Sequence, residues 1–249
     1  MSSPRDRHLT IYGRNPVAEA LDDTTVPVAR VFVADGATGP VIDRILAAAR
    51  RRGVPVERTS SDRVAMVARN GRHHQGVAAD IAPPGLEPLA PWLARRRGRL
   101  HRTAVLLLDG VHNPSNVGMI IRSATAAGID GVVVPDRRTA ELGPLVLKAS
   151  AGVALAATLL RVDDASTAVT MLREARFTVV GLDGDGDESL FDAPLPERAC
   201  YVLGNEADGL SVTTDRTLRI PLAGGVESLN VAAAATLLAF EISRRGGTG

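Results

Sequence analysis

The chain has 249 residues, of which 45% are hydrophobic and 23% are charged, a composition that excludes a disordered or collagen-like polypeptide and favours a soluble globular protein. Its longest apolar runs are far shorter than the ~20 residues needed to span a bilayer, and its first residues lack the apolar core of a signal peptide. The single cysteine, Cys200, cannot form an internal disulfide, so we expect a cytoplasmic protein without membrane association.

The formal net charge of +1 hides an asymmetry along the chain. Residues 1–103 carry 17 Arg, no Lys and 10 acidic residues, a net charge of +7, whereas the remaining residues carry 12 basic and 18 acidic residues, a net charge of −6. Arginine binds phosphate through paired hydrogen bonds and stacks on bases, so the basic part fits a nucleic-acid partner. A GC-rich genome that encodes arginine wherever a solvated cation suffices explains the same counts equally well.

Apolar periodicity predicts a small α/β domain over residues 1–81. Its helices are expected over 13–21, 41–52 and 61–68, and its strands over 28–34, 54–58 and 76–81. Asn15 and Pro16 are typical of a helix start. The prolines and arginines that follow predict a linker over residues 82–103, with a short helix around Trp92.

Residues 104–249 are predicted to form a second α/β domain. The unbroken apolar run 104–108 is typical of a parallel strand buried on both faces, and the helix and strand after it complete a βαβ unit. Further strands are expected over 131–134, 157–162, 177–182, 199–203 and 218–220, and helices over 117–127, 142–149, 166–175 and 229–245.

Three turns of this second domain carry the polar residues of most interest. They are Asn116-Val117-Gly118, the segment from Leu203 to Gly209, and Ser228-Leu229-Asn230. Each follows a predicted strand, where backbone amides can face a ligand. Ordinary helix capping explains the asparagines and the serine equally well from spacing alone. The turn from Gly204 to Gly209 is too acidic to bind a nucleotide triphosphate.

Other patterns argue against a metal or a dinucleotide cofactor. Asp183, Asp185 and Asp187 resemble the start of a calcium loop, but Glu188 stands where such a loop needs glycine. The pair His73-His74 lacks partners at zinc spacing. No glycine fingerprint follows the first strand of the second domain, which disfavours a dinucleotide-dependent oxidoreductase. We therefore expect no metal.

Together the three turns resemble the motifs of the SpoU/TrmH family of RNA 2′-O-ribose methyltransferases, in the SPOUT superfamily, over about Val105 to Arg245. The segments 11–17 and 74–77 resemble the bacterial 23S rRNA guanosine methyltransferases of that family. The resemblance implies a ribosomal-protein-like substrate-binding domain and a SPOUT domain with a mostly parallel sheet and a deep trefoil knot. It also implies S-adenosylmethionine as the cofactor, RNA as the substrate and a homodimer.

The resemblance carries residue roles as well. It implies a catalytic group at Asn116, Arg122, Glu206, Ser228 and Asn230. Cofactor contacts are implied at Leu203, Gly204, Gly209, Ile220, Leu222 and Leu229, and RNA contacts are expected at Arg14, Arg72, His74 and Gln75.

A ribose 2′-hydroxyl is a weak nucleophile that must lose its proton near the transition state, and a guanidinium is a poor base. Our hypothesis is that Arg122 acts as a cation that stabilises the developing alkoxide and grips the adjacent phosphate. A 23S rRNA guanosine is the favoured target. Methylation of tRNA, methylation of rRNA that confers antibiotic resistance, and a noncatalytic RNA-binding role in ribosome assembly are the alternatives.

Overall fold

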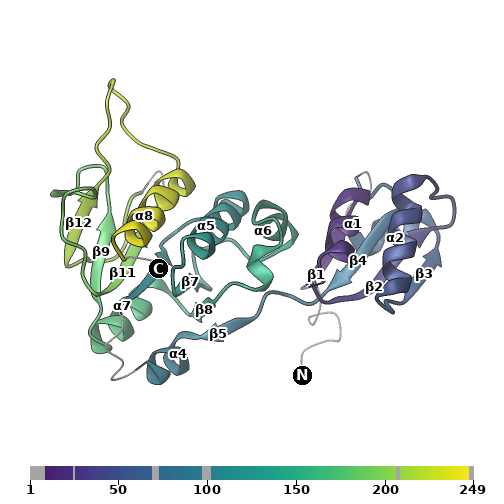
Figure 1. Ribbon diagram of the computed structural model, residues 1–249, viewed down its shortest axis with the longest axis horizontal. Coiled ribbons are helices and arrows are strands. Elements are labelled where there is room, and N and C mark those ends of the chain that lie inside the picture. The colour runs from purple at the N-terminus through teal and green to yellow at the C-terminus, as the bar shows by residue number, and fades with distance from the viewer. Residues whose placement is uncertain (1–8, 25, 69–72, 97–101, 206–207, 247–249) are drawn as a thin grey trace. The chain divides into compact units, whose positions relative to one another are not determined.

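The computed structural model describes residues 9–24, 26–68, 73–96, 102–205 and 208–246, and the chain forms two compact units, Met1–Pro83 and Pro84–Gly249 (Figure 1). Both are of mixed α/β type, and the predicted α/β class is confirmed. Within the described residues, no helix combines the length and the apolar character that crossing a membrane would require.

The first unit is a four-stranded sheet with strand order β1-β4-β2-β3. β1 and β2 run antiparallel to β4, whereas β2 and β3 are parallel. Its elements are β1 (Leu9–Tyr12), α1 (Arg14–Asp22), β2 (Val28–Ala34), α2 (Pro40–Arg51), β3 (Val56–Thr59), α3 (Ser61–Ala68) and β4 (Val77–Ile81). The last four residues of β2 are all buried, which requires helices on both faces of the sheet. α1 and α2 pack side by side on one face (Figure 1), and α3 packs against β1, β2 and β4.

One arginine of the basic part has a structural role in this unit. The guanidinium of Arg52 donates to the carbonyl oxygens of Ala20, Leu21 and Asp23 at 2.9, 3.1 and 3.0 Å, at the end of α1, and also to that of Val26. Carbonyls at a helix end lack partners within the helix, so a cation there stabilises them. Part of the positive charge is therefore committed to the fold.

The second unit is built on an eight-stranded sheet with strand order β10-β12-β9-β11-β6-β7-β8-β5, in which every strand pair is parallel. The carboxyl ends of the strands therefore lie along one edge. The strands are β5 (Leu86–Pro88), β6 (Thr103–Leu108), β7 (Gly131–Pro135), β8 (Leu159–Val162), β9 (Thr178–Leu182), β10 (Glu188–Ser189), β11 (Arg198–Leu203) and β12 (Arg216–Arg219). The predicted mostly parallel sheet is confirmed.

Helices cover both faces of this sheet. They are α4 (Leu89–Arg95), α5 (Pro114–Ala126), α6 (Pro144–Ala149), the 3-10 turn η2 (Val153–Leu155), α7 (Ala165–Glu174) and α8 (Val231–Gly246). On one face Trp92, Leu172 and Phe177 share a core with alternate residues of the central strands, Val105 and Val202 among them. On the other face α5 packs against α6 and α8, and α5 and α8 lie side by side (Figure 1).

Residues 86–95, within the segment expected to be a linker, contribute two elements to the second unit. β5 pairs with β8, and the Trp92 side chain of α4 is only 1% exposed. The prolines of this segment are compatible with both roles, because Pro88 ends an edge strand and Pro91 lies in the first turn of α4. A proline-rich composition therefore does not distinguish a linker from such a strand and helix.

Gly118 sets the distance between α5 and α6. A Cβ atom there would lie 2.5 Å from the carbonyl oxygen of Val146 and 2.6 Å from the Cβ of Ala149. A Cβ atom does not make non-bonded contacts this short, so any larger residue would force the helices apart. The glycine of the first turn motif thus serves helix packing.

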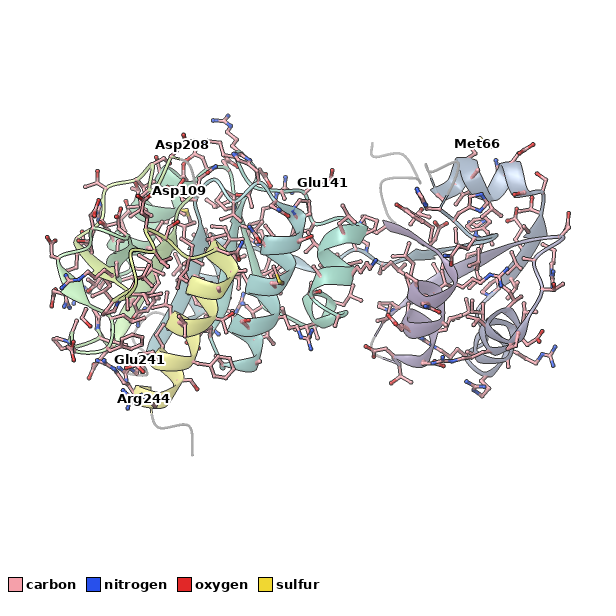
Figure 2. The ribbon with its side chains drawn as sticks, turned by 90° about the horizontal axis from the view of Figure 1, so that it is seen from above. Met66, Asp109, Glu141, Asp208, Glu241 and Arg244 are labelled. Carbon is pink, nitrogen blue, oxygen red and sulfur yellow. The ribbon has the colours of Figure 1, made fainter. Side chains whose placement is uncertain are left out.

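The carboxyl-terminal end of α8 is anchored by charged groups. Glu241 and Arg244 lie at this end of the helix (Figure 2). Glu241 is 7% exposed and accepts hydrogen bonds from Arg244 and Arg245. The hydrogen bond from Arg244, aided by that from Arg245, lowers the pKa of Glu241 to about 2. Because the folded pKa is lowered, this contribution to stability is complete above about pH 4.5 and is lost as the pH falls toward 2. Arg245 also donates to the carbonyl oxygens of Leu190 and Ala193, which ties α8 to the segment after β10.

Candidate functional site

A pocket lies at the carboxyl ends of β9, β11 and β12, where open parallel sheets bind their ligands. The residues expected to contact a cofactor all line it: Leu203, Gly204, Gly209, Ile220, Leu222 and Leu229. These residues come from three separate stretches of sequence, which the parallel arrangement of the strands brings together. Ser228, expected in the catalytic group, also lines the pocket and is exposed.

The loop after β11 owes its shape to its glycines. The backbone amides and carbonyls of Asn205 and Gly209 exchange hydrogen bonds of 3.0 and 2.9 Å, which close a tight turn. Gly209 has φ +67°, and a Cβ at Gly204 would lie 2.5 Å from the carbonyl oxygen of Gly209. Both positions therefore require glycine. Glu206, a predicted catalytic residue, lies outside the described residues.

Two contacts tie this loop to the segment after β6. The side-chain amide of Asn205 donates to the carbonyl oxygen of Gly110 at 3.0 Å. Asp109, which is 2% exposed, accepts hydrogen bonds from the backbone amide and the hydroxyl of Ser211, the latter at 2.6 Å. Asp109 directly follows the apolar run 104–108, and no role was predicted for it. An acid directly after a run of fully buried apolar residues was the available signal, since a buried charge needs partners.

Asn116 and Asn230 bring the first and third turn motifs into contact. Asn230 precedes α8, and its Oδ1 accepts from the backbone amides of Ala232 and Ala233 at 3.0 and 3.4 Å. Its Nδ2 then donates to Oδ1 of Asn116, which is 4% exposed, at 3.1 Å. The capping interpretation of Asn230 is thus correct, and the same side chain joins the two motifs.

Arg122 lies on α5 further along the helix from Asn116. It is exposed and forms no hydrogen bond or ion pair with the part of the chain that the structure describes. The next residue of α5, Ser123, accepts a hydrogen bond of 2.7 Å from the hydroxyl of Thr236 in α8. The packing of α8 on α5 therefore fixes the helix that carries Arg122 but leaves its guanidinium accessible.

The pocket is also lined by two acids, Asp183 and Glu227, for which the sequence predicted no place in a cofactor site. The spacing of Asp183, Asp185 and Asp187 resembled only the start of a calcium loop. In the structure Oδ1 of Asp183 accepts from the backbone amide of Asp185 at 2.9 Å, which accounts for the spacing of these acids as a local turn. The pocket therefore combines apolar walls with negative charge.

The residues expected to contact RNA lie in the first unit, and two of them are in contact. Gln75 Oε1 accepts from the backbone amide of Arg14 at 3.1 Å, and the Gln75 carbonyl oxygen accepts from Arg14 Nε at 3.2 Å. His74 is only 7% exposed, and its Nδ1 accepts from the backbone amide of Gly76 at 3.1 Å. A buried ring with this bond holds a turn and is poorly placed to touch RNA. Arg72 lies outside the described residues.

Comparison with known proteins identifies the family. Residues 103–240 match the SpoU rRNA methylase family, and residues 10–86 match the substrate-binding domain of RNA 2′-O ribose methyltransferases. The chain belongs to the SpoU rRNA methylase family. The family predicted from the turn motifs is thereby confirmed.

Individual relatives resemble the chain over nearly its whole length. The 23S rRNA (guanosine-2′-O-)-methyltransferase RlmB of Xanthomonas axonopodis pv. citri is 34% identical over 239 residues, which are 94% of this chain and 96% of the relative. The crystal structure of the SpoU methyltransferase AviRb from Streptomyces viridochromogenes in complex with AdoMet is 25% identical, with a TM-score of 0.70 and coverage of 98% of this chain and 93% of that one. An AdoMet-bound rRNA methyltransferase from Sinorhizobium meliloti, 24% identical with a TM-score of 0.71 over 98% and 90% of the two chains, shares the fold.

The capping role of Asn230 is open to a direct test. Asn230→Ala is expected to lower the free energy of unfolding of the second unit by about 1–2 kcal/mol, because the amides at the start of α8 lose their acceptor. Asn230→Ser keeps an acceptor and should recover most of this loss. Urea unfolding followed by Trp92 fluorescence reports on the second unit alone, since Trp92 is the only tryptophan and is buried there. Equal stability of Asn230→Ala and the wild type would contradict the capping role.

Proposed function

We propose that this protein transfers a methyl group from S-adenosylmethionine to a ribose 2′-hydroxyl of RNA, with a guanosine of 23S rRNA as the favoured target. One observation carries the proposal: the pocket at the carboxyl ends of β9, β11 and β12 is lined by all six residues that match the family's cofactor motifs. The likeness to RlmB over 94% of the chain supports the choice of 23S rRNA.

The chemistry of the pocket fits this cofactor. Leu203, Ile220 and Leu229 offer apolar surface for an adenine ring, and the glycine turn exposes backbone groups that can bind its polar edge. Asp183 and Glu227 favour a positively charged ligand. S-adenosylmethionine supplies an activated methyl group on a sulfonium, so the protein chiefly has to align donor and acceptor.

The residues around the pocket then act on the acceptor. Arg122 is exposed, and it stabilises the negative charge that develops on the ribose oxygen while it grips the neighbouring phosphate. Asn116 and Asn230 hold the two helices in register at the site. Ser228 and Glu206 complete the proposed catalytic group and position the sugar. A guanidinium stays protonated in proteins, so Arg122 is not assigned the role of base.

The first unit binds the RNA substrate. Gln75 has a left-handed backbone, with φ 51°, and holds Arg14 through two hydrogen bonds. Arg14 Nε is used in this contact, so the two terminal nitrogens remain for phosphate. His74 positions the turn, and Arg72 is proposed as a further contact. A ribosomal-protein-like fold for this unit agrees with its match to the family's substrate-binding domain.

Three further features are proposed for the whole protein. A deep trefoil knot agrees with the chain path, because β11 and β12 flank β9 and the chain after β12 returns to place α8 against α5. A cytoplasmic location agrees with a buried, unpaired Cys200, whose burial raises the pKa of its thiol well above the ordinary value and keeps it unreactive.

The third feature is a homodimer in which a second copy covers the outer face of α5 and α8. Met119 of α5 and Leu237 and Phe240 of α8 are between 41% and 50% exposed. Leu237 and Phe240 are three residues apart, so they share a face of α8, and α8 packs against α5. Large apolar side chains gathered in this way are typical of a protein interface.

Replacing both residues of α8, in Leu237→Glu with Phe240→Glu, is expected to convert the dimer to a monomer, because four carboxylates would be buried at a twofold interface. Light scattering after size-exclusion chromatography measures the mass. Met66→Glu is the control, since Met66 is 62% exposed on α3 of the other unit, and this variant should remain dimeric. A monomeric wild type, or a double variant that stays dimeric, would refute the interface.

The activity itself is tested by incubating the protein with tritiated S-adenosylmethionine and with rRNA and tRNA, and by mapping the labelled nucleotide. Arg122→Lys is expected to lower kcat by about 100-fold, because an ammonium cannot reproduce the two-pronged contact, while cofactor binding is unchanged. Arg137→Lys, at an exposed arginine that is paired with Asp164 and does not line the pocket, is the control and should be fully active. Near-normal turnover by Arg122→Lys would defeat the assigned role.

The same experiment separates the alternatives. Label on tRNA would select a tRNA methyltransferase. Cofactor binding without label on any RNA would favour the noncatalytic RNA-binding protein.

A further inference from the structure

The segment after β7 contains an arginine with a strained backbone. Arg138 has φ 62°, a left-handed conformation that is costly for a residue with a side chain. Neighbouring residues hold it there: the Thr139 hydroxyl donates to the carbonyl oxygen of Leu108 at 3.3 Å, and the backbone amide of Ala140 donates to that of Val111 at 3.1 Å. Strain that the surroundings maintain in this way is concentrated at functional sites.

The side chain of Arg138 extends from this left-handed residue toward the loops that form the proposed site. A Cβ atom on Gly110 would lie 3.8 Å from Nη2 of Arg138, and the same Nη2 lies 3.8 Å from Oδ2 of Asp208. Gly110 accepts the hydrogen bond from Asn205 that joins the loops after β6 and β11. The guanidinium therefore lies where the loops after β6, β7 and β11 meet. In Figure 2, Asp208 and Asp109 lie well apart from the Glu241 end of α8.

The contact between Arg138 and Asp208 is weak. The two side chains are 51% and 68% exposed, and a separation of 3.8 Å is beyond hydrogen-bonding distance. In contrast, Arg161 donates to both oxygens of Asp136 at 2.9 Å, and Arg173 donates to Asp215 at 2.7 Å. The guanidinium of Arg138 can therefore exchange the carboxylate of Asp208 for an anion that pairs with it better, at little cost in free energy.

We propose that Arg138 binds a backbone phosphate of the RNA at the mouth of the site, and that Asp208 competes with that phosphate for the guanidinium in the free protein. This inference rests on the proposed function, because it takes RNA as the substrate. A phosphate diester offers two oxygens to a guanidinium, which is the pairing that arginine favours. The carboxylate of Asp208, which lies 3.8 Å from the guanidinium, also repels a phosphate that binds there. Asp208 therefore lowers the affinity of the site for RNA.

The test measures binding of a fluorescein-labelled 23S rRNA fragment, carrying the nucleotide that the wild type methylates, by fluorescence anisotropy at several salt concentrations. Arg138→Ala should raise the Kd about tenfold at low salt and reduce the slope of log K against log salt by about 0.7, the value for one phosphate on a single strand. Arg138→Gly removes the side chain without backbone strain and should show the same Kd and the same slope as Arg138→Ala. Arg138→Lys should keep the slope.

Two further variants sharpen the result. Arg137→Ala removes a neighbouring arginine that is paired with Asp164 and is 76% exposed, and it should match the wild type in both Kd and slope. Asp208→Asn should bind the fragment more tightly than the wild type.

At saturating RNA, kcat of Arg138→Ala should be unchanged while KM for RNA rises, which a general loss of structure would not produce.

The inference is overturned if Arg138→Ala and Arg137→Ala show the same Kd and slope, or if Asp208→Asn binds RNA no better than the wild type. A wild type that methylates no RNA would instead defeat the proposed function. The two failures are therefore distinguishable.

Discussion

The parallel alignment of the eight strands is the constraint on which the rest of the structure depends. It places the carboxyl ends of β6, β9, β11 and β12 along one edge, so that loops far apart in sequence become neighbours. Hydrogen bonds then lock the loops together: Asn205 to Gly110, Ser211 to Asp109, and Asn230 to Asn116, with sequence separations of 95, 102 and 114 residues. Each bond joins two of the segments that surround or adjoin the pocket. The site is therefore a property of the whole unit, and none of the turns could form it alone.

The groups that stabilise this unit also shape the pocket and its surroundings. Asn230 caps α8 and also holds Asn116, and Gly204 closes the turn that forms one wall of the pocket. A residue that looks like an ordinary cap in the sequence can thus define the geometry of a site. Capping and the proposed role at the site are therefore compatible at Asn230, because one oxygen caps α8 while the side-chain nitrogen donates to Asn116.

The sequence predicted local structure well where periodicity is strong. β2 and α3 have the bounds that were predicted, and the apolar run of β6 is buried on both faces. In the segment predicted to be a linker, the short helix expected around Trp92 is α4, but β5 was not predicted, because a proline at the end of an edge strand looks like proline in a flexible segment. The six residues expected to contact a cofactor, which line the pocket, were proposed only through resemblance to a family. The contacts of Asp109 and Arg138 were not predicted, because both are made with distant loops and the local sequence contains no pattern for them. His74, expected to contact RNA, is 7% exposed and accepts a hydrogen bond from the backbone amide of Gly76, and the local sequence contained no signal for this burial.

The central claim is that the loops after β9, β11 and β12 form a pocket for S-adenosylmethionine. Isothermal titration of the purified protein with this cofactor tests it most directly, with Gly204→Ala as the site variant and Gly85→Ala, which has nothing within 4 Å of the added Cβ, as the control. We expect saturable binding by the wild type and by Gly85→Ala, and at least about tenfold weaker binding by Gly204→Ala, since its Cβ would collide with the backbone of Gly209. A wild type that does not bind the cofactor, or a Gly204→Ala variant that binds it equally well, would contradict the account.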